Sequence, residues 1–73
     1  MHLTIVSLDD GRLSEINIDN FTELSYYISG STRIFHDNLS SLQIFKDVTY
    51  NFKGDKQVSL IGSKISYIEL SNS

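Results

Sequence analysis

The chain has 73 residues and a mass of 8.3 kDa, so we expect a single domain, residues 1–73. With 40% hydrophobic residues, 21% charged residues and a net charge of −3, it is too apolar to be intrinsically disordered. The absence of cysteine excludes disulfides and thiolate metal sites. No apolar run approaches the roughly 20 residues that span a bilayer, so we expect a cytoplasmic protein.

The first expected element is a β-hairpin over residues 2–18. A β-branched apolar run leads into Asp9-Asp10-Gly11, and Asp-Gly favours a type I′ turn because both central residues of that turn need positive φ. After the turn, Ile16 and Ile18 alternate with polar residues, which indicates one buried face. The lack of alanine and the many isoleucine and aromatic residues favour strands in most of the chain.

Residues 20–29 are the exception, because their pattern predicts a short amphipathic helix. Asn20 and Glu23 have the spacing of a capping box, and Gly30 is placed to end the helix in the left-handed conformation. The apolar stripe that would pack on the sheet consists of Phe21, Leu24 and Ile28.

The remaining strands are expected within residues 32–70, and the tail 71–73 is expected to fray. The alternation predicts strands at 32–36, 42–52, 58–60 and 64–70, joined by turns at 37–41, 53–56 and 62–63. Leu42, Ile44, Val48, Tyr50 and Phe52 share one face of the long second strand. The predicted fold class is therefore α+β, in the order ββ-α-ββββ. It would be a small antiparallel sheet or partly open barrel of five to six strands, with the helix packed on it.

Several apolar residues do not fit the faces that this arrangement would bury. On the expected helix Tyr26 lies almost opposite the apolar stripe, and Tyr27 lies on its flank. Phe45 points away from the apolar face of its strand, and Ile61 is out of phase with its neighbours. These four side chains are therefore candidate partner-binding residues. The alternative is that β-bulges at 46–47 and 67–68 correct the phases.

The size of the chain also favours association. One hydrophobic core below about 70–80 residues rarely supplies more than about 3–5 kcal/mol of stability, and this chain has no disulfide to add to it. We therefore expect a homodimer or a higher oligomer. Asp9 and Asp10 could steer a partner from an acidic face, and we include them among the candidate partner-binding residues.

The sequence does not indicate an enzyme, a cofactor or a metal site. His2 and His36 lie at strand ends without a G-x-S-x-G elbow, and the aspartates are explained as turn residues. The alternative to protein binding is a small β-barrel that binds single-stranded nucleic acid. It would use the lysines of the second half and the nearby aromatic residues: Lys46, Lys53, Lys56, Lys64, Tyr50, Phe52 and Tyr67.

The start Leu3-Thr4-Ile5 with its Asp10-Gly11 turn, the expected short helix and the ending Lys64–Glu69 resemble short phage- and prophage-encoded proteins of low-GC Gram-positive bacteria. The resemblance implies a non-enzymatic accessory protein that binds a host protein, in some cases inhibiting a defence nuclease such as a CRISPR nuclease. It implies no site residue. The expected function is thus a non-catalytic protein-binding module, acting as a homo-oligomer, that occludes a host protein.

Overall fold

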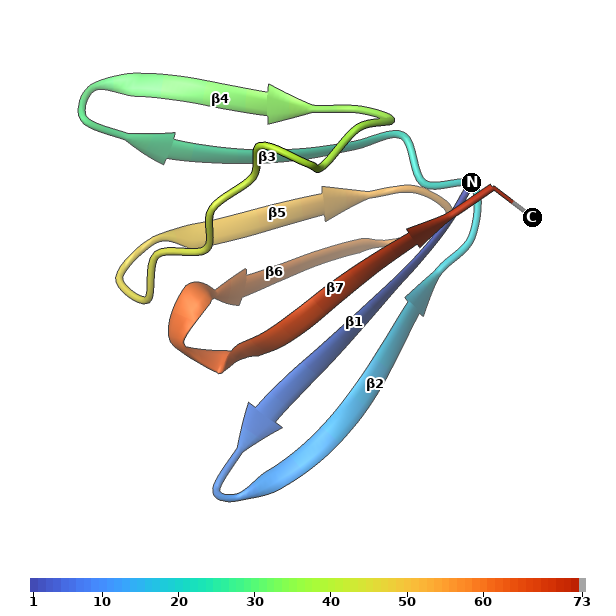
Figure 1. Ribbon diagram of the computed structural model, residues 1–73, viewed down its shortest axis with the longest axis vertical. Helices are drawn as coiled ribbons and strands as arrows, with labels where there is room; N and C mark the ends of the chain where they lie inside the picture. Colours follow the sequence, from blue (N-terminus) through green and yellow to red (C-terminus); the bar gives the residue numbers. More distant parts are fainter. Residues whose placement is uncertain (73) are drawn as a thin grey trace.

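The computed structural model describes residues 1–72, in which the chain forms two antiparallel sheets (Figure 1). The three-stranded sheet has the order β2-β1-β7 and the four-stranded sheet the order β4-β3-β5-β6. The elements are β1 (His2–Asp9), β2 (Arg12–Ile18), β3 (Glu23–Ile28), β4 (Ser31–Phe35), β5 (Thr49–Lys53), β6 (Gln57–Ile61), the 3₁₀ helix η1 (Gly62–Lys64) and β7 (Ile65–Ser71).

The expected helix at 20–29 is wrong, and with it the α+β class: residues 1–72 contain no α-helix, and Glu23–Ile28 form the strand β3. Leu24 pairs with Phe35 of β4 on one side and with Phe52 of β5 on the other. A helix of under three turns is marginal by itself, whereas a central strand has hydrogen-bonded neighbours on both sides. The helical stripe was a coincidence of spacing in a segment rich in strand-forming residues.

Two tight turns of one kind build the two N-terminal hairpins. The hairpin at 2–18 is confirmed, and its central turn residues Asp10 and Gly11 have φ of 50° and 78°. Ser29 and Gly30 repeat this conformation, with φ of 51° and 79°, and join β3 to β4. Gly30 is therefore left-handed, as expected, but it closes a hairpin of type I′ character instead of ending a helix.

The core lies between the two sheets and draws on both. The three-stranded sheet contributes Leu3, Ile5 and Ile18, and the four-stranded sheet contributes Leu24, Tyr26, Tyr50 and Phe52. Phe21 joins this core from the connection between the sheets, where its backbone N–H donates to the Met1 carbonyl at 2.8 Å. Burying one such large side chain stabilises the fold by about 1.5–3 kcal/mol.

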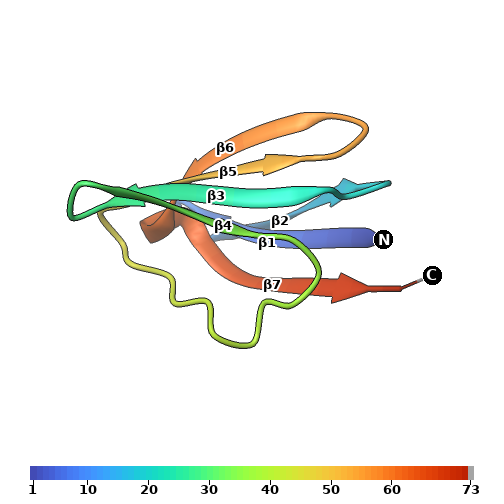
Figure 2. The same cartoon turned by 90° about the horizontal axis from the view of Figure 1, so that it is seen from above.

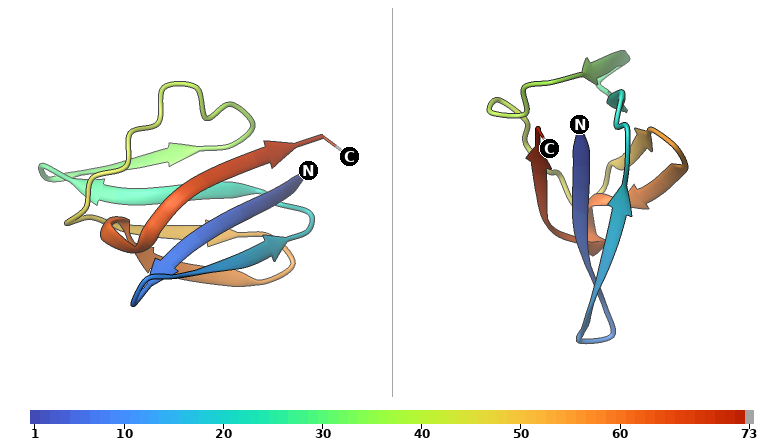
Figure 3. Two further views of the ribbon diagram at one scale, coloured as in Figure 1. Left: turned by 60° about the horizontal axis from the view of Figure 1, so that its bottom comes forward. Right: turned by 90° about the vertical axis from the view of Figure 1, so that its right-hand side faces the viewer.

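The strand expected at 42–52 is shorter in the structure, because residues 36–48 form a loop between β4 and β5. In Figures 2 and 3 this loop and β7 lie on the same side of the molecule. Tyr50, which is fully buried, holds the loop: its hydroxyl accepts from the Phe45 N–H at 2.8 Å and donates to the Gln43 carbonyl at 2.9 Å. Ile44, expected on the apolar face, is exposed as a result.

A β-bulge in β7 sets the face of each of its side chains. Val6 pairs with Tyr67 but Ser7 pairs with Ile65, so Ser66 has no partner in β1. This irregularity lies one position before the bulge considered at 67–68, and it turns Tyr67 to the surface while Ile65 packs on the core. The tail was expected to fray over 71–73, but Ser71 still pairs with His2 in the sheet. Ser73 lies outside the described residues.

Candidate functional site

The outer face of the three-stranded sheet carries a group of adjacent apolar side chains. Since Leu3, Ile5 and Ser7 face the core, the alternate residues of β1 face outward. In the register of the sheet, Leu8 lies opposite Leu13 of β2, and Val6 lies opposite Tyr67 of β7. Leu13, Tyr67 and Leu8 are 66%, 58% and 44% exposed. We call Val6, Leu8, Leu13 and Tyr67 the outer patch.

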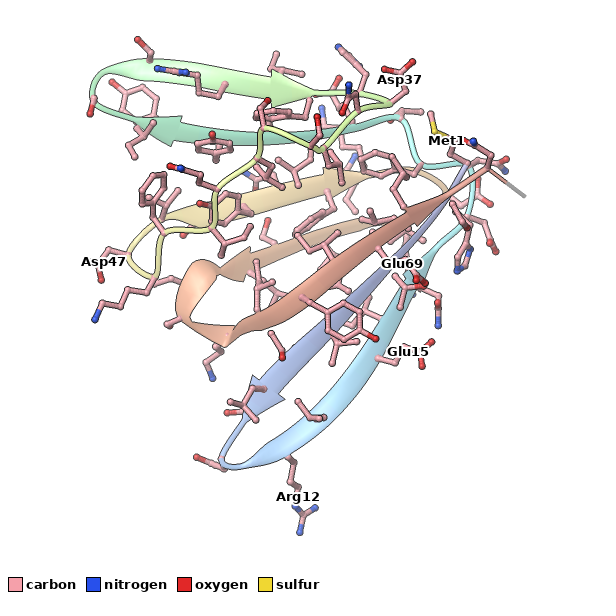
Figure 4. All side chains as sticks on the ribbon, in the orientation of Figure 1. Met1, Arg12, Glu15, Asp37, Asp47 and Glu69 are labelled. Carbon is pink, nitrogen blue, oxygen red and sulfur yellow. The ribbon has the colours of Figure 1, made fainter. Side chains whose placement is uncertain are left out.

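Acidic side chains border the outer patch. Glu15 lies opposite Val6 on β2, and Glu69 follows Tyr67 by two residues on the same face of β7. Figure 4 labels Glu15 and Glu69, and it places Arg12 at the tip of the β1–β2 hairpin. The charged residues around the patch are Asp9, Asp10, Glu15 and Glu69 against Arg12 and Lys64, two basic residues against four acidic ones. The rim is therefore acidic.

One ion pair ties the rim to η1. The Lys64 ammonium donates to an Asp9 carboxylate oxygen at 3.0 Å, and this hydrogen bond raises the pKa of Lys64 above its ordinary value. Both side chains are largely exposed, so the pair contributes little to stability. The pair joins the β1–β2 turn to η1, the 3₁₀ helix that leads into β7.

A second candidate site lies between the β3–β4 hairpin and the loop 36–48, and we call it the β3–β4 cleft. Its volume is about 390 Å³. Tyr26 and Phe35 stack in its wall with ring centroids 6.1 Å apart and an interplanar angle of 9°, and Gln43 and Phe45 approach from the loop. Arg33 lies directly opposite Tyr26 in the register of the hairpin and also lines the cleft.

The structure separates the partner-binding residues expected from sequence. Tyr26 is only 6% exposed, so its predicted exposure is wrong: as a residue of β3 it faces the core, where its ring packs on Tyr50 with centroids 4.8 Å apart. It does share the β3–β4 cleft with Phe45. Tyr27 faces the opposite side of β3 and is exposed.

The other three expected residues lie away from that cleft. Ile61 is exposed at the end of β6, opposite Thr49. Asp9 and Asp10 lie at the β1–β2 turn, which Figure 1 places at the opposite end of the molecule from the β3–β4 hairpin. The acidic residues Asp9 and Asp10 thus lie away from Tyr26 and Phe45, at the end of the molecule where Leu8 and Leu13 are exposed.

Sequence reasoning missed the outer patch, although a signal for it was present. A two-residue turn at Asp10-Gly11 pairs Asp9 with Arg12, and therefore Leu8 with Leu13. Both leucines then face the side opposite to Ile5 and Ile16. Counting the register outward from the turn would have found this pair. The position of Tyr67 depends on the bulge at Ser66, which no local pattern specified.

The two histidines contact polar groups of neighbouring segments. Both ring nitrogens of His2 face acceptors, with Nδ1 2.7 Å from an Asp19 oxygen and Nε2 2.9 Å from the Asn17 side-chain oxygen. The hydrogen bonds to Asn17 and then to Asp19 raise the pKa of His2, because both favour the protonated ring. The Nδ1 atom of His36 lies 3.3 Å from the Thr22 carbonyl oxygen. Within residues 1–72, no three His, Asp or Glu side chains gather to hold a metal ion.

The lysines proposed for nucleic-acid binding lie in two groups, at opposite ends of β5. Lys64 is paired with Asp9, and Lys46 lies beside η1, where its carbonyl accepts from the Ser63 N–H. Lys53 and Lys56 border the turn at the other end of β5. Tyr50 and Phe52 are buried in the core and offer no face for a base to stack on.

Comparison with protein-family models, curated proteins and solved structures finds no match to this chain. In the part of the chain that the structure describes, residues 1–72, no helix has the length and apolarity to cross a membrane.

Proposed function

We propose that this chain is a small, non-catalytic, cytoplasmic protein-binding module and that the outer patch is its binding surface. The observation that carries the proposal is that Leu8, Leu13 and Tyr67, three large apolar side chains about half exposed or more, share one sheet face. Val6 lies between Tyr67 and the Leu8–Leu13 pair on that face. Interfaces have an apolar centre with aromatic anchors and a polar rim. Burying such side chains contributes about 1.5–3 kcal/mol each when it is complete.

The charge of the rim determines the chemistry of the partner. Glu15 and Glu69 flank the patch, and the chain as a whole carries a net charge of −3. The partner is therefore a protein with an apolar centre bordered by lysine or arginine. The same acidic rim disfavours packing of two copies face to face through this patch. The resemblance to phage-encoded accessory proteins makes a host protein, such as a defence nuclease, the expected partner, and binding would act by occlusion.

The test compares two double variants in capture from a lysate of a low-GC Gram-positive bacterium. Leu13→Ser/Tyr67→Ser disrupts the outer patch, whereas Ile34→Ser/Tyr27→Ser removes similarly exposed side chains from the other sheet. Proteins that the wild type and the control retain should be lost by the patch variant, and their retention should weaken as salt increases. Equal retention by both variants, or no retained protein, would overturn the proposal.

Self-association would use a different part of the molecule, the free edge of β6. Each of the other edge strands carries a charge, with Glu15 on β2, Arg33 on β4 and Glu69 on β7, whereas Gln57–Ile61 of β6 has none. Charged side chains protect edges from pairing, so β6 is the edge most open to a second copy. Antiparallel pairing centred on Ser59 places Val58 opposite Leu60 of the partner.

Light scattering after size exclusion tests this edge. Ser59→Lys brings two like charges together at the centre of the paired strands and should convert the dimer to a monomer. Thr32→Lys, on the outer face of the β4 edge, serves as the matched control and should remain a dimer. A wild type that stays monomeric at every concentration, or a Ser59→Lys variant that still dimerises, would refute self-association through β6.

A further inference from the structure

The β4 strand reverses the usual placement of polar and apolar residues. Ile34 faces solvent and is 52% exposed, whereas its charged neighbour Arg33 faces the same side as Tyr26 and Phe35. Within residues 1–72 no carboxylate pairs with Arg33. Local departures from the expected pattern occur where a function requires them. Arg33 therefore places an uncompensated cation in the wall of the β3–β4 cleft.

The other polar side chains of the cleft are uncharged and can each donate a hydrogen bond. The Tyr26 ring is buried, but its hydroxyl bonds to no other group in residues 1–72 and is reached by solvent. Ser29, Ser41 and Gln43 also line the cleft, and no Asp or Glu does. Such a lining offers donors to an anion and presents no charge that would repel it.

The rest of the cleft determines what kind of anion fits. A guanidinium pairs with a carboxylate through two parallel hydrogen bonds, and one Arg neutralises one negative charge. The rings of Phe35 and Phe45 and the side chain of Ile28 supply apolar contacts beside it. A volume of about 390 Å³ is at the small end of the range of roughly 300–1,000 Å³ for small-molecule sites.

We propose that the β3–β4 cleft binds a monocarboxylate carried on an aromatic or branched apolar body. Arg33 pairs with the carboxylate, the Tyr26 hydroxyl donates a further hydrogen bond, and Phe35 and Phe45 contact the body. The same chemistry is presented by a small aromatic acid and by the C-terminal residue of a peptide. The cleft lies between the four-stranded sheet and the loop 36–48, whereas the outer patch lies on the three-stranded sheet. This inference therefore does not depend on the proposed partner surface.

The test is a titration of the isotope-labelled protein followed by amide chemical shifts, with phenylacetate as the probe. Shifts should saturate at residues 28–35 and 41–45. Phenylacetamide, which lacks the charge, should bind at least about tenfold more weakly, as expected for loss of a charge-assisted contact. Acetate, which keeps the charge but lacks the aromatic body, should also bind at least about tenfold more weakly, because it buries no ring. Equal binding of phenylacetate and phenylacetamide, or no shifts in the cleft, would overturn the proposal.

Variants separate ligand recognition from a structural role of the charge. An inward-facing charge can also protect an edge strand from aggregation. Arg33→Lys keeps that charge but cannot form the bidentate pair of hydrogen bonds with a carboxylate. Arg33→Lys should unfold at the wild-type urea concentration yet bind phenylacetate about tenfold more weakly or worse. Arg12→Lys, at the tip of the other hairpin, should bind as the wild type does. If Arg33→Lys binds phenylacetate as tightly as the wild type does, Arg33 serves only to protect the edge strand, and the carboxylate site is refuted.

A peptide ending in phenylalanine distinguishes the two sources of the carboxylate. If the peptide acid binds at least tenfold more tightly than phenylacetate, and its C-terminal amide does not, the ligand is a chain terminus. If phenylacetate binds as tightly as the peptide, the ligand is a small acid. Both results support the cleft as a carboxylate site. If the peptide amide binds as tightly as the peptide acid, recognition of the carboxylate is refuted.

Discussion

Replacing Tyr50 with phenylalanine should loosen the loop 36–48 around Gln43 and Phe45 while leaving the core packed. The Tyr50 ring is fully buried, so phenylalanine fills the same volume. Only the hydroxyl is removed, together with its two hydrogen bonds, one from the Phe45 N–H at 2.8 Å and one to the Gln43 carbonyl at 2.9 Å. The two backbone groups then lose their partner.

The size of the effect follows from these two bonds. Each contributes about 0.5–1.5 kcal/mol net, and a buried group left unsatisfied would cost more. Phe45 and Gln43 are exposed residues, so water can reach part of the freed backbone, and we expect a loss of about 1–2 kcal/mol. For a domain of this size that lowers the melting temperature by roughly 5–15 °C.

Urea unfolding followed by far-ultraviolet circular dichroism measures the loss of stability, and amide hydrogen exchange localises it. Exchange at the Phe45 N–H should accelerate about tenfold for each 1.4 kcal/mol lost. Tyr27→Phe is the matched control, because Tyr27 is 67% exposed, and it should stay within about 0.5 kcal/mol of the wild type. If Tyr50→Phe matches this control in both stability and Phe45 exchange, the hydroxyl does not hold the loop.

Two further predictions concern other contacts of the fold. Gly62→Ala would place a Cβ atom in steric overlap with the Phe45 carbonyl oxygen, so the backbone must move. The free energy of unfolding should fall by about 1–3 kcal/mol. An unchanged urea midpoint would mean that the loop 36–48 does not pack on η1. Hydrogen bonds to Asn17 and Asp19 raise the pKa of His2 in the folded protein above its value of 6.5 in the unfolded chain. Protonated His2 therefore stabilises the fold fully below pH 6.5, and this stabilisation is lost as the pH rises through the higher pKa of the folded protein. The urea midpoint of the wild type should therefore fall, relative to that of His2→Gln, between pH 6 and pH 8.5, and parallel curves would contradict the assignment.

The segment 20–29 shows why local patterns predicted one element wrongly. Phe21, Leu24 and Ile28 have helical spacing, but Leu24, Tyr26 and Ile28 also alternate as a strand does. The two patterns coexist in one short segment, so the choice between them depends on neighbours. In the structure β4 and β5 supply backbone partners on both sides of β3, and this pairing decides for the strand.

The candidate sites were predictable only in part for a related reason. Phe45 was found because its position broke an alternation, yet its neighbours in the cleft come from β3 and β4. Arg33 is a single charge in an expected strand, and only the pairing of β3 with β4 places it opposite Tyr26 in the cleft. The outer patch requires the register of three strands, including a bulge at Ser66 that shifts Tyr67 outward.

By itself the sequence determined what acts over a few neighbouring residues. The backbone conformation at Gly11 and Gly30, the strand-forming composition and the inward face of Ile16 and Ile18 follow from steric preferences and side-chain period, which need no distant contact. The tertiary structure alone decided that β3 is a strand and which apolar side chains stay exposed. Those outcomes depend on hydrogen-bond partners and packing surfaces that are distant in the chain, and their energies exceed the local preferences that favoured a helix.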